Sequence, residues 1–204
     1  MLSFYVGVQE WAFVRVLPGQ TNYLLTTGLA TCVAVVCTFP GRATFLAHVD
    51  GDPDKLEEQK EALRCLNNRL VLNRSDHSVL LVSNADSNCV RHLRALILGL
   101  DNFKDKVRTE TGNSAIAAIG DPNVAVTKQF ANKCREMGIP FDYDEETDEG
   151  TYVTMMSKDE FGDITYKMNH GRIQPVIQLF NTTAYGRAGR LDPQSCSSVA
   201  AMSF

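Results

Sequence analysis

The sequence predicts a strand-rich α+β domain in which a layered sheet is flanked by about three helices. Two observations lead to this fold class. The first 50 residues hold short, apolar, β-branched runs separated by turn residues, which is typical of strands. Further along, the apolar spacing changes to that of amphipathic helices, and helical and strand-like segments alternate. The composition agrees, because 44% of the 204 residues are hydrophobic and 22% are charged.

The N-terminal part is predicted to form strands. We expect them at residues 2–8, 11–16, 32–38 and 43–49, with turns at Pro18-Gly19 and at residues 39–41. The run at residues 32–38 is apolar throughout, as in a strand that is buried on both faces. Later strands are expected at residues 78–83, 114–120, 152–156, 164–168 and 175–180.

Three helices are predicted from capping signals and spacing. Asp52-Pro53 combines an N-cap with a proline in the first turn. The helix that it opens carries one apolar face, formed by Leu56, Leu63, Leu66 and Leu70. A second and more buried helix is expected at residues 90–98, and a third between Asp121-Pro122 and Gly138. Residues 1–191 are expected to form one domain, followed by a loosely held, Ser- and Ala-rich tail at residues 192–204.

Charge and composition disfavour several classes of protein. Twenty Lys and Arg against 24 Asp and Glu give a net charge of −4, whereas proteins that bind nucleic-acid phosphates are usually basic. No apolar run reaches the ~18 residues of a membrane span, and the N-terminus lacks a signal-peptide pattern. The acidic run at residues 142–149 is interpreted as a solvated loop. We therefore expect neither nucleic acid nor membrane as a partner.

The cysteines do not form a metal-binding pattern. The six cysteines are scattered, no Cys-x-x-Cys pair occurs, and without a secretory signal they are expected to be reduced. The spacing of Cys32, Cys37 and His48 matches no common zinc site. Phosphate-loop motifs are also absent from the sequence. We predict no metal and no cofactor.

A cysteine and a histidine are predicted to meet on one hairpin. If residues 39–41 form a three-residue loop, Thr38 faces Arg42, and Cys32 then lies directly opposite His48. Opposed residues have Cβ atoms ~4.5–5.5 Å apart and share a face of the sheet. A histidine in this position can accept the proton of a thiol and stabilise the nucleophilic thiolate. The alternative is structural, with Cys32 a buried small hydrophobe and His48 hydrogen-bonded at a strand end.

Other residues near this pair could assist it. Thr26, Thr31 or Asp50 could orient the imidazole ring, which is the third role in such triads. The backbone N–H of Cys32 is a candidate donor to an oxyanion. In the segment Asn169-His170-Gly171-Arg172, His170 could line a pocket. Thr31, Asp50 and His170 are therefore candidate substrate-binding residues.

The segment at residues 26–52 resembles a known family. Its pattern is Thr-x-Gly-Leu-x-[Ser/Thr]-Cys-Val-Ala-Val-x-Cys, with an Ala-His pair whose His follows the first Cys by 16 residues. This resembles the chemoreceptor glutamine deamidases (CheD), which use a Cys, a His and a Thr. The resemblance implies Cys32, His48 and Thr26 as the catalytic residues. The family usually has Gly-Ser where this chain has Ala30-Thr31.

Two further groups share parts of this pattern. The Ala-Thr-Cys and His-Val-Asp-Gly-Asp segments also look like those of the protein N-terminal asparagine amidohydrolases. The cytotoxic-necrotizing-factor deamidase toxins share only a looser Cys and His arrangement. Together the resemblances imply a CheD-like fold and a Cys-His amidohydrolase-like domain over residues 1–191.

The resemblance implies a cysteine-dependent protein deamidase. Such an enzyme hydrolyses a Gln or Asn side-chain amide of a protein or peptide to the acid and releases ammonia, in the cytoplasm or as an effector in a host cell. Two alternatives remain at this point. The chain could be a catalytically silent binding or regulatory module on the same fold, or another thiol enzyme, a peptidase or a transglutaminase.

Overall fold

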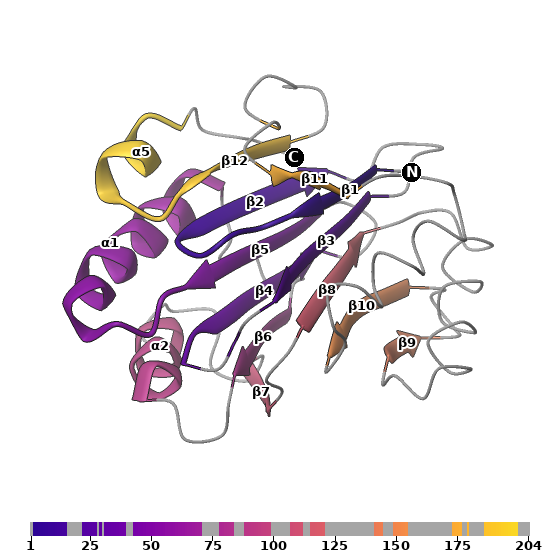
Figure 1. Ribbon diagram of the computed structural model, residues 1–204, viewed down its shortest axis with the longest axis horizontal. Coiled ribbons are helices and arrows are strands. Elements are labelled where there is room, and N and C mark those ends of the chain that lie inside the picture. Colours follow the sequence, from indigo (N-terminus) through magenta and orange to yellow (C-terminus); the bar gives the residue numbers. More distant parts are fainter. Residues whose placement is uncertain are drawn as a thin grey trace.

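The computed structural model of the chain is a stack of two sheets and a layer of helices (Figure 1). The residues that it describes are 2–15, 22–27, 29, 31–39, 43–70, 78–83, 88–98, 107–111, 115–120, 141–144, 149–154, 173–176, 179 and 186–199. The described residues form two six-stranded sheets, which we call sheet A and sheet B. They also form helices α1 (Pro53–Leu70), α2 (Asn88–Leu98) and α5 (Pro193–Ser197).

Sheet B holds the strands that the sequence predicted best. Its order is β12 (Gly186–Arg190), β2 (Glu10–Arg15), β5 (Ala43–Val49), β4 (Val33–Phe39), β6 (Ser78–Ser83) and β7 (Val107–Thr111). The first five strands pair antiparallel, and β7 joins β6 in parallel. The strands at residues 43–49 and 78–83 have the predicted bounds.

Sheet A combines N-terminal strands with strands from the second half of the chain. Its order is β11 (Ile173–Pro175), β1 (Leu2–Tyr5), β3 (Asn22–Thr27), β8 (Ala115–Gly120), β10 (Glu149–Thr154) and β9 (Phe141–Asp144). Strand β1 pairs in parallel with β11 and β3, and the remaining pairs are antiparallel.

Alternating side chains on sheet B separate two apolar clusters. On one face, Val33, Val35 and Phe45 join the buried leucines of α1 and α2. On the other, Ala34 and Leu46 join residues of the segments around sheet A, including Phe4 and Leu24. The layers therefore run from helices to sheet B to sheet A, and Figure 1 shows α1, α2 and α5 together on one side of the strands. Each fully buried large apolar side chain contributes about 1.5–3 kcal/mol.

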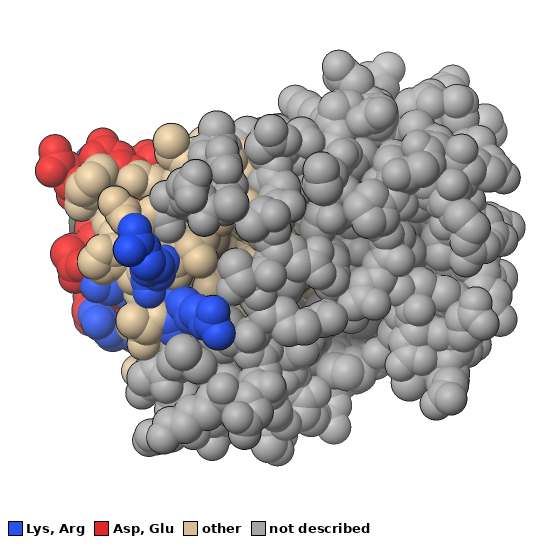
Figure 2. Space-filling model, turned by 90° about the horizontal axis from the view of Figure 1, so that it is seen from below, with Lys and Arg blue, Asp and Glu red and all other residues tan. Residues whose placement is uncertain are grey.

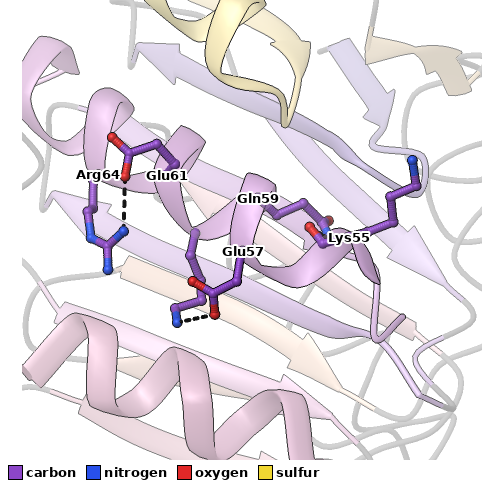
Figure 3. A network of polar contacts seen from close by, with 6 residues as sticks. Lys55, Glu57, Gln59, Glu61 and Arg64 are labelled. Atoms are coloured by element: carbon purple, nitrogen blue, oxygen red, sulfur yellow. Dashed lines mark hydrogen bonds and ion pairs between the residues drawn. The ribbon is translucent and has the colours of Figure 1, made fainter. Parts of the chain in front are cut away.

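Helix α1 begins and is oriented as the sequence predicted. The Asp52 carboxylate accepts the Asp54 N–H at 3.0 Å, which is an N-cap, and Pro53 follows it. The predicted apolar face is buried. On the solvent side, Glu57 pairs with Lys60 and Glu61 with Arg64 (Figure 3). Such i,i+3 pairs stabilise a helix by only about 0.2–0.5 kcal/mol each.

Helix α2 lies at the surface and is not the more buried helix that was predicted. Its described side chains include Cys89, Leu93 and Leu96, which are buried, whereas Arg91, His92, Arg94 and Ala95 are exposed. The face of the molecule in Figure 2 shows Lys and Arg beside Asp and Glu. The described part of that face therefore carries charges of both signs.

Some segments differ from the prediction. In the predicted acidic loop at residues 142–149, residues 142–144 lie in β9 and Glu149 begins β10. Val176 and Leu179 lie in 3₁₀ turns, whereas a strand was predicted at residues 175–180. Strand β12 was missed because its sequence Gly-Arg-Ala-Gly-Arg is rich in glycine, which strands disfavour. A Cβ on Gly186 would lie 2.0 Å from the Phe13 carbonyl oxygen, so this strand needs glycine for its close approach to β2.

The predicted loose tail begins with a packed helix. Asp192 caps α5 by accepting the Ser195 N–H at 2.7 Å, and Cys196 and Val199 are buried. The Arg69 guanidinium of α1 donates to the Val199 carbonyl at 2.8 Å. The helix predicted after Asp121-Pro122 and the strand at residues 164–168 lie outside the described residues. Among the described helices, none has the length and apolar character needed to cross a membrane.

Candidate active site

The predicted register of the β4–β5 hairpin was wrong by two residues. Phe39 pairs with Ala43, so Ala34 and not Cys32 lies opposite His48. Strand β4 includes Phe39, an aromatic residue that favours strands, whereas a loop was predicted at residues 39–41. A shift of two residues preserves the face, because side chains alternate with period two.

Cys32 and His48 are therefore diagonal neighbours. Cys32 immediately precedes β4 and belongs to the apolar cluster between the sheets, on the same face as His48. Diagonal positions on antiparallel strands are roughly 7–8 Å apart, within reach of a thiol, an imidazole and a substrate atom between them. Continuing the register places Cys32 opposite Asp50.

A hydrogen bond between the two sheets fixes the imidazole of His48. The Thr26 hydroxyl in β3 lies 2.6 Å from Nδ1 of His48 in β5, and 2.7 Å from the carbonyl oxygen of Val6. The hydroxyl has one proton, and the carbonyl can only accept. If Thr26 donates to Val6, Nδ1 must carry the proton that joins it to Thr26. The other ring nitrogen, Nε2, is then unprotonated and basic.

Burial keeps this imidazole neutral. His48 is 0% exposed, and its Nε2 atom has no hydrogen-bond partner among the described residues. Burial lowers the pKa of His48 to about 4, against the opposing effect of the Asp50 charge. At neutral pH the site thus holds a base with a free lone pair in apolar surroundings.

Cys32 lies near His48 and close to the protein surface. It is 8% exposed, and the preceding residue, Thr31, is exposed. Gly51 packs against the Thr31 backbone, and a Cβ on Gly51 would lie 2.0 Å from the Thr31 carbonyl oxygen. Glycine at residue 51 therefore lets the segment before Cys32 approach the segment after His48. Burial raises the pKa of both Cys37 and Cys89 to about 12, so these thiols are poor nucleophiles.

Asp50 is held by residues that were not predicted. Its carboxylate accepts Gln9 Nε2 at 2.8 Å and the Asp52 N–H at 3.1 Å. Its backbone N–H donates to Gln59 Oε1 at 2.7 Å, and Gln59 Nε2 donates back to its carbonyl at 3.1 Å. Thr31 and Asp50, two of the predicted substrate-binding residues, thus flank Cys32 and His48. The third, His170, lies outside the described residues.

One of the missed residues carries a signal in the sequence. Gln59 is spaced with Leu56, Leu63 and Leu66 on the buried face of α1, and a polar residue on an apolar face indicates a buried partner. Gln9 has no comparable signal. Within the described ranges, no group of three or more His, Cys, Asp or Glu side chains is arranged to hold a metal ion.

The geometry unites three of the predicted residues. Thr26 and His48 are in contact, and Cys32 lies on the same face one diagonal step away. No model of a known protein family matches this chain, and no curated protein matches it significantly.

Proposed function

We propose that the protein is a cysteine-dependent deamidase with a CheD-like fold that hydrolyses a Gln or Asn side-chain amide of a protein or peptide. The observation that carries the proposal is the buried Thr26–His48 hydrogen bond, which leaves Nε2 of His48 as a free base near Cys32. The similarity of residues 26–52 to the deamidases supports the reaction type. The proposed place of action is the cytoplasm or the interior of a host cell.

The proposed reaction has two steps. His48 takes the Cys32 proton, and the thiolate adds to the amide carbon. The carbon–nitrogen bond breaks, ammonia leaves with the proton from His48, and a thioester remains on Cys32. Water then gives a proton to His48, attacks the thioester and releases Glu or Asp, and the proton returns to the thiol. Thr26 holds the ring in one tautomer throughout.

The first test is the reactivity of Cys32. Iodoacetamide labelling of each cysteine between pH 5 and 9 is followed by peptide mass spectrometry. We expect Cys32 to label at least about ten-fold faster than Cys37, which lies on the same hairpin and serves as an internal control. Equal labelling of the two cysteines would reject an activated thiolate.

The second test is release of ammonia from Gln- and Asn-containing peptides. Cys32→Ala should reduce the rate by about a thousand-fold or more, because the nucleophile is lost. Cys37→Ala is the matched control and should retain activity while losing some stability. Chain cleavage would indicate a peptidase instead, and crosslinking without formation of Glu or Asp would indicate a transglutaminase.

A second candidate is a silent binding or regulatory module. It is favoured by the low exposure of Cys32, which is 8%. Slow labelling of Cys32 together with retained binding to a peptide that contains Gln or Asn would favour this module.

A further inference from the structure

Gln9 has an unusual backbone conformation in the turn between β1 and β2. Its φ angle is +60°, and it is the only described residue other than glycine with a positive φ. The left-handed region costs an L-residue about 1–2 kcal/mol, and Gly, Asn and Asp are the usual residues there. Glutamine is not one of these residues, and its side chain makes a specific contact to Asp50.

The contacts of Gln9 join three separate segments. Its backbone N–H donates to the carbonyl of His48 at 2.9 Å, and its carbonyl accepts the Leu191 N–H at 2.7 Å. Its side chain donates to the Asp50 carboxylate at 2.8 Å. Gln9 is therefore hydrogen-bonded to His48, to Asp50 and to Leu191, which directly follows β12.

The Asp50 carboxylate is the charge that this arrangement fixes. Both of its oxygens accept hydrogen bonds, from Gln9 and from the Asp52 backbone. Its charge raises the pKa of His48 against the larger effect of burial. The other titratable groups whose charges couple to this region are Cys32 and Cys89, and the Cys89 thiol lies 4.0 Å from the Asp50 carbonyl oxygen.

We propose that Gln9 is a positioning residue of the Cys32–His48 site: its backbone anchors His48, and its side chain holds the Asp50 carboxylate where it supports the imidazolium. The inference rests on the proposed function, because an imidazolium forms when His48 accepts the Cys32 proton. A more basic His48 increases the fraction of Cys32 present as thiolate.

The variant Gln9→Gly isolates the side chain. Glycine tolerates the positive φ and keeps both backbone hydrogen bonds, so the fold should keep about its normal stability. Without the amide donor the carboxylate keeps only its hydrogen bond from the Asp52 N–H and is held less firmly, and we expect labelling of Cys32 at pH 7 to slow about three-fold. The NMR titration midpoint of His48 should fall correspondingly. Val8→Ala, a change at the exposed neighbour in the same turn, should alter neither quantity.

A double-mutant cycle tests whether Gln9 acts through Asp50. In the Asp50→Asn background, Gln9→Gly should produce no further change, because the charge that it positions is already gone. Equal effects of Gln9→Gly with and without the Asp50 charge would overturn the inference. So would an unchanged His48 midpoint in Gln9→Gly.

The two proposals fail in different ways. If Cys32 is unreactive in the unmodified protein, the deamidase proposal fails, and the His48 titration still tests the role of Gln9. If Cys32 is reactive but Gln9→Gly changes neither labelling nor titration, only the role of Gln9 is rejected.

Discussion

One hydroxyl determines which nitrogen of His48 is basic. Thr26 reaches both the Val6 carbonyl and Nδ1 of His48 from β3. The carbonyl of Val6 uses the only hydroxyl proton, which leaves Nδ1 as the donor. Thr26 therefore acts on the tautomer of His48 as well as on its orientation.

Replacement of Thr26 by Val should expose this role. Thr26→Val removes the partner of two buried polar groups and should cost about 1–3 kcal/mol of the free energy of unfolding. We expect ammonia release to fall by about a hundred-fold or more, since the ring loses its fixed tautomer. Thr26→Ser keeps the hydroxyl and should restore most of the rate. Ring ¹⁵N NMR shifts of His48 report the tautomer directly.

Thr44→Val provides a matched control for this substitution. Thr44 lies on β5 with His48 and is buried, but its hydroxyl has no hydrogen-bond partner among the described residues. The same Thr-to-Val change should therefore leave stability unchanged or raise it, and should leave the rate alone. A Thr26→Val protein that keeps both its rate and its tautomer would contradict the role of Thr26.

At the scale of elements, α1 supports the site through a buried glutamine. Gln59 is 2% exposed, whereas Glu57 and Glu61 extend from the solvent side of the same helix (Figure 3). Its amide pairs with both backbone polar groups of Asp50, as a neighbouring strand would. Helix packing and the position of the segment after His48 are thus coupled.

The substitution Gln59→Met should uncouple the packing of α1 from the position of the segment after His48. Methionine matches glutamine in size and fills the space, but it leaves the Asp50 N–H and carbonyl without their side-chain partner. We expect the free energy of unfolding in urea to fall by about 1–3 kcal/mol. Glu58→Met places the same residue on the exposed face of α1 and should change stability by less than about 0.5 kcal/mol. Equal effects of the two substitutions would show that the buried amide contributes nothing.

The elements predicted correctly are those with strong local patterns. Helix α1 has a cap, a proline and a regular apolar face, and β5 and β6 are apolar runs of ordinary strand length. Strand β12 depends on its pairing with β2, which is distant in sequence, so local patterns could not reveal it. The start of α5 carries the same Asp-Pro signal as α1, at Asp192-Pro193, but the Ser- and Ala-rich composition of the tail led to the prediction of a loose segment.

The site was predicted in part for a similar reason. Cys32 and His48 were placed on one face from hairpin geometry, although the pairing was shifted by two residues. Thr26 was one of three residues predicted to orient the ring, and only the resemblance singled it out, since its contact with His48 crosses from sheet A to sheet B. Gln9 depends on a positive φ, and glutamine gives no local signal for that conformation.

At the scale of the whole molecule, the site lies between two packed sheets. His48 and Thr26 are both 0% exposed, and the apolar cluster around them joins residues from both sheets. A titratable group in this position links its protonation to the stability of the entire fold. Protonation of His48 would place a charge in the interior, and the nearby Asp50 charge opposes part of the cost.

This linkage predicts the pH dependence of stability. The pKa of His48 is about 4 in the folded protein and about 6.5 when unfolded, so between these values the unfolded chain binds more protons. The contribution of the neutral imidazole to the free energy of unfolding is complete above pH 6.5 and is lost as the pH falls toward 4. Urea denaturation should show about 2 kcal/mol less stability at pH 5.0 than at pH 7.5.

A variant without the imidazole separates this effect from other titrations. His48→Gln retains an amide that can face Thr26 but does not titrate, whereas the carboxylates are the same in both proteins. We expect the variant to lose less than about half as much stability between pH 7.5 and 5.0. Parallel losses would mean that His48 is solvated or already charged in the folded protein, and a neutral imidazole could then no longer be assigned as the base for Cys32.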